Sequence, residues 1–207
     1  MKAATTRIIL GLVWLAVIGA GEVVLLNFEN APGHAGQTPP QWPTDIPITL
    51  DSGRSTLLMF VHPRCPCTRA SIGELNRLLA RCEDRVAARV LFLKPASLPD
   101  EWTETDSWRQ AAAIRGVSVL PDLDGALARR FGAETSGHVV LFDPKGRLLF
   151  KGGITAGRGH AGDNVGANLI LASLAGQGPD LKQTPVYGCS LVEACEAISK
   201  GEGVWQE

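Results

Sequence analysis

The sequence has almost no net charge and few aromatic residues. Its 20 Lys and Arg are balanced by 21 Asp and Glu, which gives a formal net charge of −1 at pH 7. Nucleic-acid-binding proteins carry a basic patch or a clearly basic composition, so this balance excludes that class of partner. The sequence also lacks internal repeats, and its 207 residues are enough for one ordinary domain with appendages.

The number of cysteines is odd. With five in the chain, at least one must be free, metal-bound or paired between chains. Cys65 and Cys67 are separated by a single residue, unlike the scattered cysteines of a structural disulfide framework. The count alone does not identify the redox compartment, which the N-terminal sequence indicates instead.

The N-terminal segment predicts export. Lys2 and Arg7 precede an apolar stretch over residues 8–28 in which Glu22 is the only charge. About twenty apolar residues suit a membrane-spanning helix, whereas a cleavable signal peptide would use a shorter core, with Ala20 near the cut. We favour an uncleaved anchor. Basic residues before the apolar stretch keep the N-terminus in the cytoplasm. We therefore expect a single-pass protein of a bacterial-type inner membrane with its soluble domain in the periplasm.

Composition divides the rest of the chain. Residues 30–45 are rich in Pro, Gly and polar side chains, which is typical of a linker. We expect an anchor over residues 1–29, a linker over 30–45, a folded domain over 46–178, and a C-terminal extension over 179–207 that carries Cys189 and Cys195.

Hydrophobic patterning within the domain predicts alternating strands and helices, closed by an antiparallel hairpin. This order is typical of an α/β fold with a mixed central sheet flanked by helices. The expected strands cover residues 57–61, 86–93, 117–120, 138–142 and 147–150, and the expected helices cover 68–82, 104–114, 122–131 (capped by Asp122 and ended by Gly132) and 167–174.

The chemistry centres on one hexapeptide at a strand-to-helix junction, His62-Pro63-Arg64-Cys65-Pro66-Cys67. A helix N-terminus carries partial positive charge, which favours thiolate over thiol. Proline is tolerated at the first helical position, so Pro66 there would make Cys65 the N-cap. We predict that Cys65 attacks and Cys67 resolves the mixed disulfide.

The single residue between the two cysteines also matters for the direction of exchange. A Cys65–Cys67 disulfide closes a very small ring, and strained geometry makes the bond easier to reduce. The oxidised form would then tend to donate its disulfide. His62 would act either as a proton shuttle that keeps the thiolate ionised or as a strand-end residue that caps local backbone.

The strand, the Cys-Pro-Cys motif and its helix, followed by Asp122–Gly132 and His138–Gly146, resemble the thioredoxin fold of TlpA-type membrane-anchored oxidoreductases. A closer resemblance, covering about residues 42 to 191, is to RedB-type thioredoxin-like proteins. It rests on four segments: His62–Cys67, Gly152–Thr155, Arg158–Asn164 and Thr184–Cys189.

The resemblance implies further site residues. Ser136-Gly137-His138 takes the place of the family's cis-proline, which faces the cysteines, so Gly137 and His138 are expected to meet the partner together with Pro66. The residues themselves indicate further candidates. Arg158 and His160 lie on a polar, glycine-rich loop suited to binding a partner or an anion. Cys189 is a possible third redox thiol or a metal ligand, while Cys82 and Cys195 fit a buried core.

We therefore expect an exported, membrane-tethered thiol–disulfide oxidoreductase that acts on a protein thiol or disulfide and needs no cofactor beyond its own cysteines. The alternative is a copper-binding or copper-delivery protein, because two thiolates and an imidazole from Cys65, Cys67 and His138 suit Cu(I). Peroxide reduction is disfavoured, since the Pro/Thr/Cys spacing of peroxiredoxins is missing around Cys65.

Overall fold

A computed structural model describes residues 2–82, 84–177 and 182–192 of the chain. Two compact units are present, residues 1–31 and residues 32–207. The first is helix α1 (Lys2–Asn30), of which Thr5–Asn30 is long and apolar enough to cross a membrane. By length and composition it is therefore a membrane-anchor candidate, as predicted. Cys195 lies outside the described residues.

The second unit is built on a six-stranded mixed sheet in the order β3-β2-β1-β4-β5-β6. Strands β1, β2 and β3 are parallel, and β4 runs antiparallel to both β1 and β5. A β-α-β unit followed by a β-β-α unit, joined through the central β1–β4 pair, is the thioredoxin-like arrangement that the sequence predicted. The strands are β1 (Ser55–Val61), β2 (Val86–Lys94), β3 (Val117–Leu123), β4 (His138–Phe142), β5 (Leu148–Gly152) and β6 (Lys182–Gln183).

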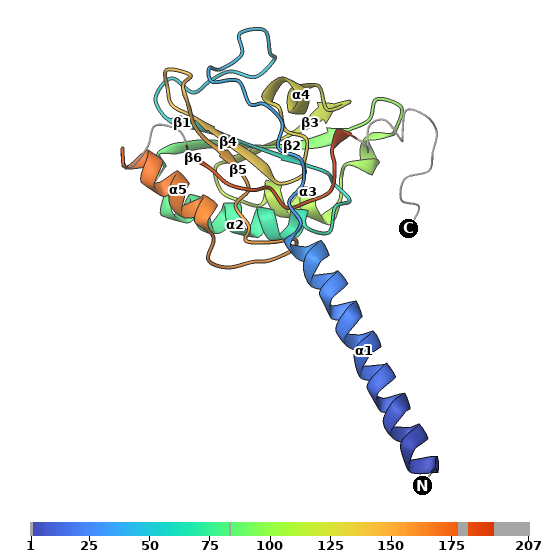
Figure 1. Ribbon diagram of the computed structural model, residues 1–207. Coiled ribbons are helices and arrows are strands. Elements are labelled where there is room, and N and C mark those ends of the chain that lie inside the picture. Colours follow the sequence, from blue (N-terminus) through green and yellow to red (C-terminus); the bar gives the residue numbers. More distant parts are fainter. Residues whose placement is uncertain (1, 83, 178–181, 193–207) are drawn as a thin grey trace. The chain divides into compact units, whose positions relative to one another are not determined.

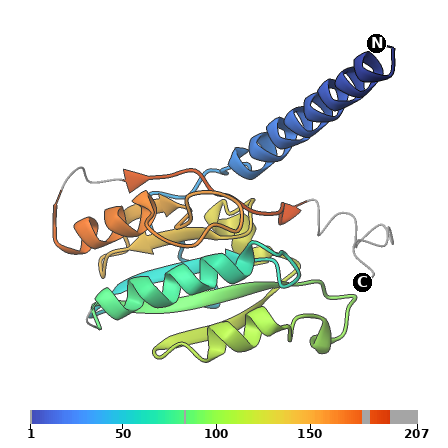
Figure 2. The ribbon, with the colours of Figure 1, turned by 90° about the horizontal axis from the view of Figure 1, so that it is seen from below.

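Helices cover both faces of the sheet. In Figure 1, α2, α3 and α5 lie below the sheet and α4 lies above it, and Figure 2 shows the first three side by side from below. One core lies between the sheet and α2, α3 and α5, and the other lies on the α4 side. The helices are α2 (Thr68–Arg81), the short 3₁₀ turn η1 (Asp100–Trp102), α3 (Asp106–Ala112), α4 (Ala126–Phe131) and α5 (Val165–Leu174).

The predicted elements are present, with local differences at their ends. Strand β3 continues through Pro121 to Leu123, because it is an edge strand and an edge tolerates a missing N–H. Gly125, not Asp122, is the N-cap of α4. The Asp122 carboxylate still caps that helix, since it accepts hydrogen bonds from two N–H groups of its first turn.

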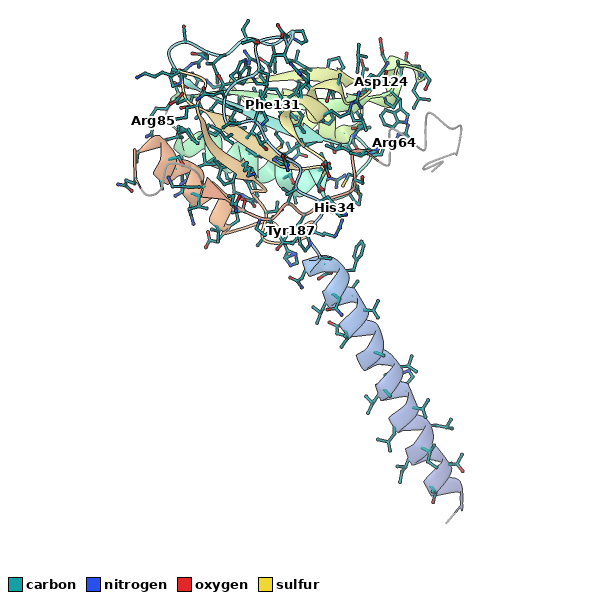
Figure 3. All side chains as sticks on the ribbon, turned by 45° about the horizontal axis from the view of Figure 1, so that its top comes forward. His34, Arg64, Arg85, Asp124, Phe131 and Tyr187 are labelled. Carbon is teal, nitrogen blue, oxygen red and sulfur yellow. The ribbon has the colours of Figure 1, made fainter. Side chains whose placement is uncertain are left out.

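The segment expected as a linker differs from the prediction. Residues 32–42, here called the strap, pack on the domain through backbone hydrogen bonds that composition does not reveal. Gly33 N–H donates to Val186 O at 2.8 Å, and Trp42 N–H donates to Gly146 O at 2.7 Å. Figure 3 shows His34 and Tyr187 next to each other where the strap passes the C-terminal segment. Residues 182–192 of the expected C-terminal extension also pack on the domain.

The strap contributes one large side chain to the core on the α4 side. The Trp42 ring makes edge contacts with Phe131 and Phe142, at centroid distances of 5.2 and 5.3 Å. Aromatic contacts of this geometry stabilise beyond the area they bury. The strap is therefore part of the fold and not only a connection to α1.

We expect Trp42→Ala to lower the free energy of unfolding of the full chain by about 2 to 3 kcal/mol, toward the small end of large-to-small aromatic substitutions because Trp42 is only half-buried. Gln41→Ala, an exposed strap residue, is the matched control and should change stability by less than about 0.5 kcal/mol. Denaturant unfolding in detergent followed by circular dichroism measures both. Equal stability of the two variants would mean that the strap does not support the domain.

Candidate functional site

The hexapeptide forms a turn between β1 and α2, and its cysteines lie differently from the prediction. Helix α2 begins at Thr68 with Cys67 as its N-cap, so the prediction of Cys65 at that position is wrong. Cys65 N–H donates to His62 O at 3.2 Å, and Thr68 N–H donates to Cys65 O at 3.1 Å. These two bonds close a turn that holds Pro66 before the helix instead of at its first position.

The Ser136 hydroxyl joins the elements that carry the cysteines. It accepts a hydrogen bond from His62 N–H at 2.9 Å and shares another with the Thr68 hydroxyl at 3.0 Å. The Ser136 N–H donates to Cys189 O at 2.8 Å. Ser136, in the segment that replaces the family's cis-proline, therefore positions the C-terminal segment with Cys189 beside the start of α2.

Three thiols meet at this junction, with Cys65 in the middle. Hydrogen bonding from the side chains of Cys189 and Cys67, and then from the backbone of each residue, lowers the pKa of Cys65 well below the usual thiol range, although burial acts in the opposite direction. Cys65 is the thiolate of the cluster.

The two outer thiols stay protonated. The pKa of Cys67 and that of Cys189 are raised, first because each thiol donates to Cys65 and then because each is partly buried. Arg158 opposes both shifts electrostatically, and its Nη1 donates to Gly188 O at 2.6 Å. Arg158 therefore places a positive charge near the two outer thiols, on the loop where the sequence predicted it.

The loop with Arg158 is fastened to α2 by a buried carboxylate that sequence reasoning missed. Glu74 is 4% exposed and accepts hydrogen bonds from Gly162 N–H at 2.5 Å and from Asn164 Nδ2 at 3.3 Å. Asn164 is the N-cap of α5, because its side chain accepts a hydrogen bond from Ala167 N–H. His160 lies on the exposed side of this loop. Glu74 interrupts the apolar face of α2, and this charge on an otherwise apolar face could have indicated a buried carboxylate from the sequence.

A cleft opens beside Cys65. It has a volume of about 610 Å³, and its lining includes Cys65, Pro66 and the exposed Arg64 and Arg69. Figure 3 marks Arg64, whose guanidinium also lies over the Trp102 ring at 5.5 Å. Cys65 is only 3% exposed, and this cleft borders it.

His62 is buried against the same turn. Its Nδ1 accepts a hydrogen bond from Arg64 N–H at 3.1 Å, and its ring contacts Trp102 edge-on. Burial lowers the pKa of His62 to about 4, so the ring is neutral at pH 7. In this structure His62 caps local backbone, which is the second of the two roles considered from the sequence.

His138 does not join the thiols. It lies on the sheet face of Val140 and Phe142, whereas α2 packs on the opposite face, against Val139 and Leu141. Burial lowers the pKa of His138 to about 4. Its neighbour Gly137 has a φ of +90°, and a Cβ there would lie 2.9 Å from the Ser71 hydroxyl, so glycine is needed at that position.

The copper ligand set of Cys65, Cys67 and His138 is therefore not assembled in this structure. Within the part of the chain that the structure describes, no group of three or more His, Cys, Asp or Glu side chains is arranged to hold a metal ion. Cys82 is buried in the core among apolar side chains, and burial raises its pKa, as expected for an inert thiol.

No protein-family model matches the sequence, and no curated protein matches it. Among solved structures, a hypothetical protein from Sinorhizobium meliloti is 21% identical, with a TM-score of 0.57, and the alignment covers 80% of this chain and 97% of that one. An uncharacterized conserved protein from Geobacillus kaustophilus is 20% identical, with a TM-score of 0.55, and the alignment covers 79% of this chain and 93% of that one.

Other solved structures are less similar. StoA from Bacillus subtilis is 17% identical, with a TM-score of 0.44, and the alignment covers 70% of this chain and 98% of that one. At these identities the two structures with TM-scores above 0.5 concern the fold alone, and the description of that fold as thioredoxin-like rests on this chain's own strand order. The chemistry rests on this chain's own residues.

We expect the alkylation rate of Cys65 to stay high at a pH near 6, well below the usual thiol pKa of about 8.5. Cys189→Ala removes the side chain that lowers the pKa of Cys65 most, so the alkylation of Cys65 should then require a higher pH. Cys82→Ala, the matched control, should leave the pH dependence unchanged. Mass spectrometry of the labelled peptides gives the rate at each pH. A profile unaffected by Cys189→Ala would contradict the arrangement of donors described above.

Proposed function

We propose that this protein is an exported, membrane-tethered thiol–disulfide oxidoreductase in which Cys65 exchanges disulfides with a partner protein. The observation that carries the proposal is the convergence of hydrogen bonding from the side chains and backbone of Cys189 and Cys67 on Cys65, beside an open cleft. A buried thiol without such donors would stay protonated, as Cys82 does.

The reaction follows from the order of pKa values in the cluster. The Cys65 thiolate attacks one sulfur of the partner's disulfide, forming a mixed disulfide and releasing the other partner sulfur as a thiolate. A neighbouring thiol then loses its proton and attacks Cys65, which closes an internal disulfide and releases the second partner thiolate. Two electrons pass from this protein to the partner, and the reverse sequence oxidises a partner dithiol. Arg158 stabilises the thiolate of the resolving residue.

The partner binds where the cleft meets Pro66. Arg64 and Arg69 line it, and so do Thr105 and Ser107 from the start of α3. An extended segment of a protein would fit such a polar cleft better than a small apolar molecule. The two electrons come from thiols, so the reaction needs no further cofactor. Helix α1 would keep the exchange at the periplasmic side of the membrane.

Replacing the central thiol should abolish exchange. We expect Cys65→Ser to lose the ability to reduce a model protein disulfide, and Cys67→Ser to accumulate more mixed disulfide than the wild type because one resolving thiol is missing. Cys82→Ser, which removes a thiol outside the cluster, is the matched control. Non-reducing electrophoresis with thiol trapping detects each species. Activity of Cys65→Ser equal to that of Cys82→Ser would refute the proposal.

The small ring of the Cys-Pro-Cys disulfide predicts an oxidising couple. In a Cys189→Ala variant, where Cys65 can pair only with Cys67 inside the cluster, we expect a reduction potential closer to about −120 mV than to about −270 mV. Equilibration with a glutathione series, followed by mass-based trapping, measures it. A value at the reducing end would show that the ring is not strained.

A further inference from the structure

We propose that Cys189, and not Cys67, is the stable disulfide partner of Cys65, so that the resting oxidised protein contains a Cys65–Cys189 disulfide. This inference rests on the proposed function and names the residue that completes it. The Cys-Pro-Cys disulfide then becomes a short-lived species in exchange with the Cys65–Cys189 form.

The backbone on both sides of Cys189 is fixed at the site. Leu191 N–H donates to Glu134 O, and Ser136 N–H donates to Cys189 O, each at 2.8 Å. Arg158 holds the carbonyl of Gly188, on the other side of the cysteine. These bonds hold Cys189 beside Ser136. The Ser136 hydroxyl in turn binds the His62 N–H and the Thr68 hydroxyl, which flank the Cys65 turn, so Cys189 lies next to that turn without any rearrangement of the C-terminal segment.

The approach is tight because a glycine allows it. A Cβ at Gly188 would lie 2.1 Å from Ser136 O. Larger residues at Gly188 would push the segment away from Ser136 and from the thiols. The sequence therefore permits Cys189 to lie beside the Cys65 turn and to lower the pKa of Cys65 as Cys67 does, although Cys189 and Cys65 are far apart along the chain.

The two possible disulfides differ in the ring that they close. Cys65 and Cys67 flank a single proline, so their disulfide must depart from relaxed geometry. Cys65 and Cys189 lie on separate segments that are already held together, so their disulfide needs no such departure. This difference favours Cys65–Cys189 at equilibrium in the folded protein.

The interconversion is an internal exchange without net oxidation. The thiol of Cys189 loses its proton, its thiolate attacks Cys65 in the Cys65–Cys67 disulfide, and Cys67 leaves as a thiolate that takes up a proton. Arg158 is close to both the attacking and the leaving sulfur and stabilises each as a thiolate. The oxidant that first forms the disulfide is the partner's disulfide or glutathione disulfide.

Trypsin separates the two products. Cleavage after Arg64 and Arg69 places Cys65 and Cys67 together on the peptide 65–69, and cleavage after Lys182 and Lys200 places Cys189 on the peptide 183–200. The full chain in detergent, with Cys82→Ser and Cys195→Ser to remove other thiols, is oxidised with glutathione disulfide, trapped with an alkylating reagent and digested. We expect the cross-linked pair of peptides to exceed the internally bridged peptide 65–69 by at least about tenfold.

Two variants identify which sulfur is linked. The cross-link should persist in Cys67→Ser and disappear in Cys65→Ser. The Cys65 couple should also be harder to reduce by at least about tenfold in the equilibrium constant when Cys189 is present than in Cys189→Ala.

The result that overturns the inference is a peptide 65–69 that carries the only disulfide, which would leave the proposed function intact with Cys67 as the resolving thiol. A cross-link that survives Cys65→Ser would also overturn it, since Cys67 would then be the partner of Cys189. The absence of any disulfide at every glutathione ratio would overturn both this inference and the proposed function.

Discussion

The hydroxyl of Ser136 is the contact on which the arrangement of the site depends. It accepts from the last backbone N–H of the strand end at His62, shares a hydrogen bond with the first side chain of α2, and belongs to the residue whose N–H holds Cys189. Ser136, His62 and Thr68 are all buried. Losing a polar group from any of these residues would therefore leave its partner without a hydrogen bond in the interior. Through its hydroxyl and its N–H, Ser136 thus fixes the positions of four segments relative to one another. These are β1, α2, the approach to β4 and the C-terminal segment.

Around that contact, the chemistry is set by competition between burial and hydrogen-bond donors. Cys65 and Cys82 are both buried, yet the pKa of one is lowered and that of the other is raised. The difference is the set of donors that face the sulfur, not its depth in the protein. The helix N-terminus matters less than the sequence suggested, because Cys67, which is the N-cap of α2, is the protonated neighbour of Cys65.

The sequence predicted the features that depend on neighbouring residues, and it missed those that depend on contacts between distant parts of the chain. The strand at 57–61 and the helix that begins at Thr68 follow from apolar runs and helical spacing, and the hairpin follows from its turn residues. The strap escaped prediction because its glycines and prolines use backbone groups to dock, and composition carries no record of such bonds. The proximity of Cys189 to Cys65 depends on contacts across about half the chain, while Arg158 was recognised only because its loop is conspicuously polar.

The number of thiols in the cluster, three, is odd, and this has a chemical consequence. Disulfides consume sulfurs in pairs, so no internal disulfide can use up all three of Cys65, Cys67 and Cys189 at once. When an internal disulfide forms within the cluster, the third member keeps a nucleophilic sulfur beside that bond. A site with two cysteines is either a dithiol or a disulfide, and its disulfide can be opened only by a thiol from another molecule. The oxidised form of this site still contains a thiol that can attack its own disulfide. Such a site is suited to rearranging disulfides as well as to making or breaking them.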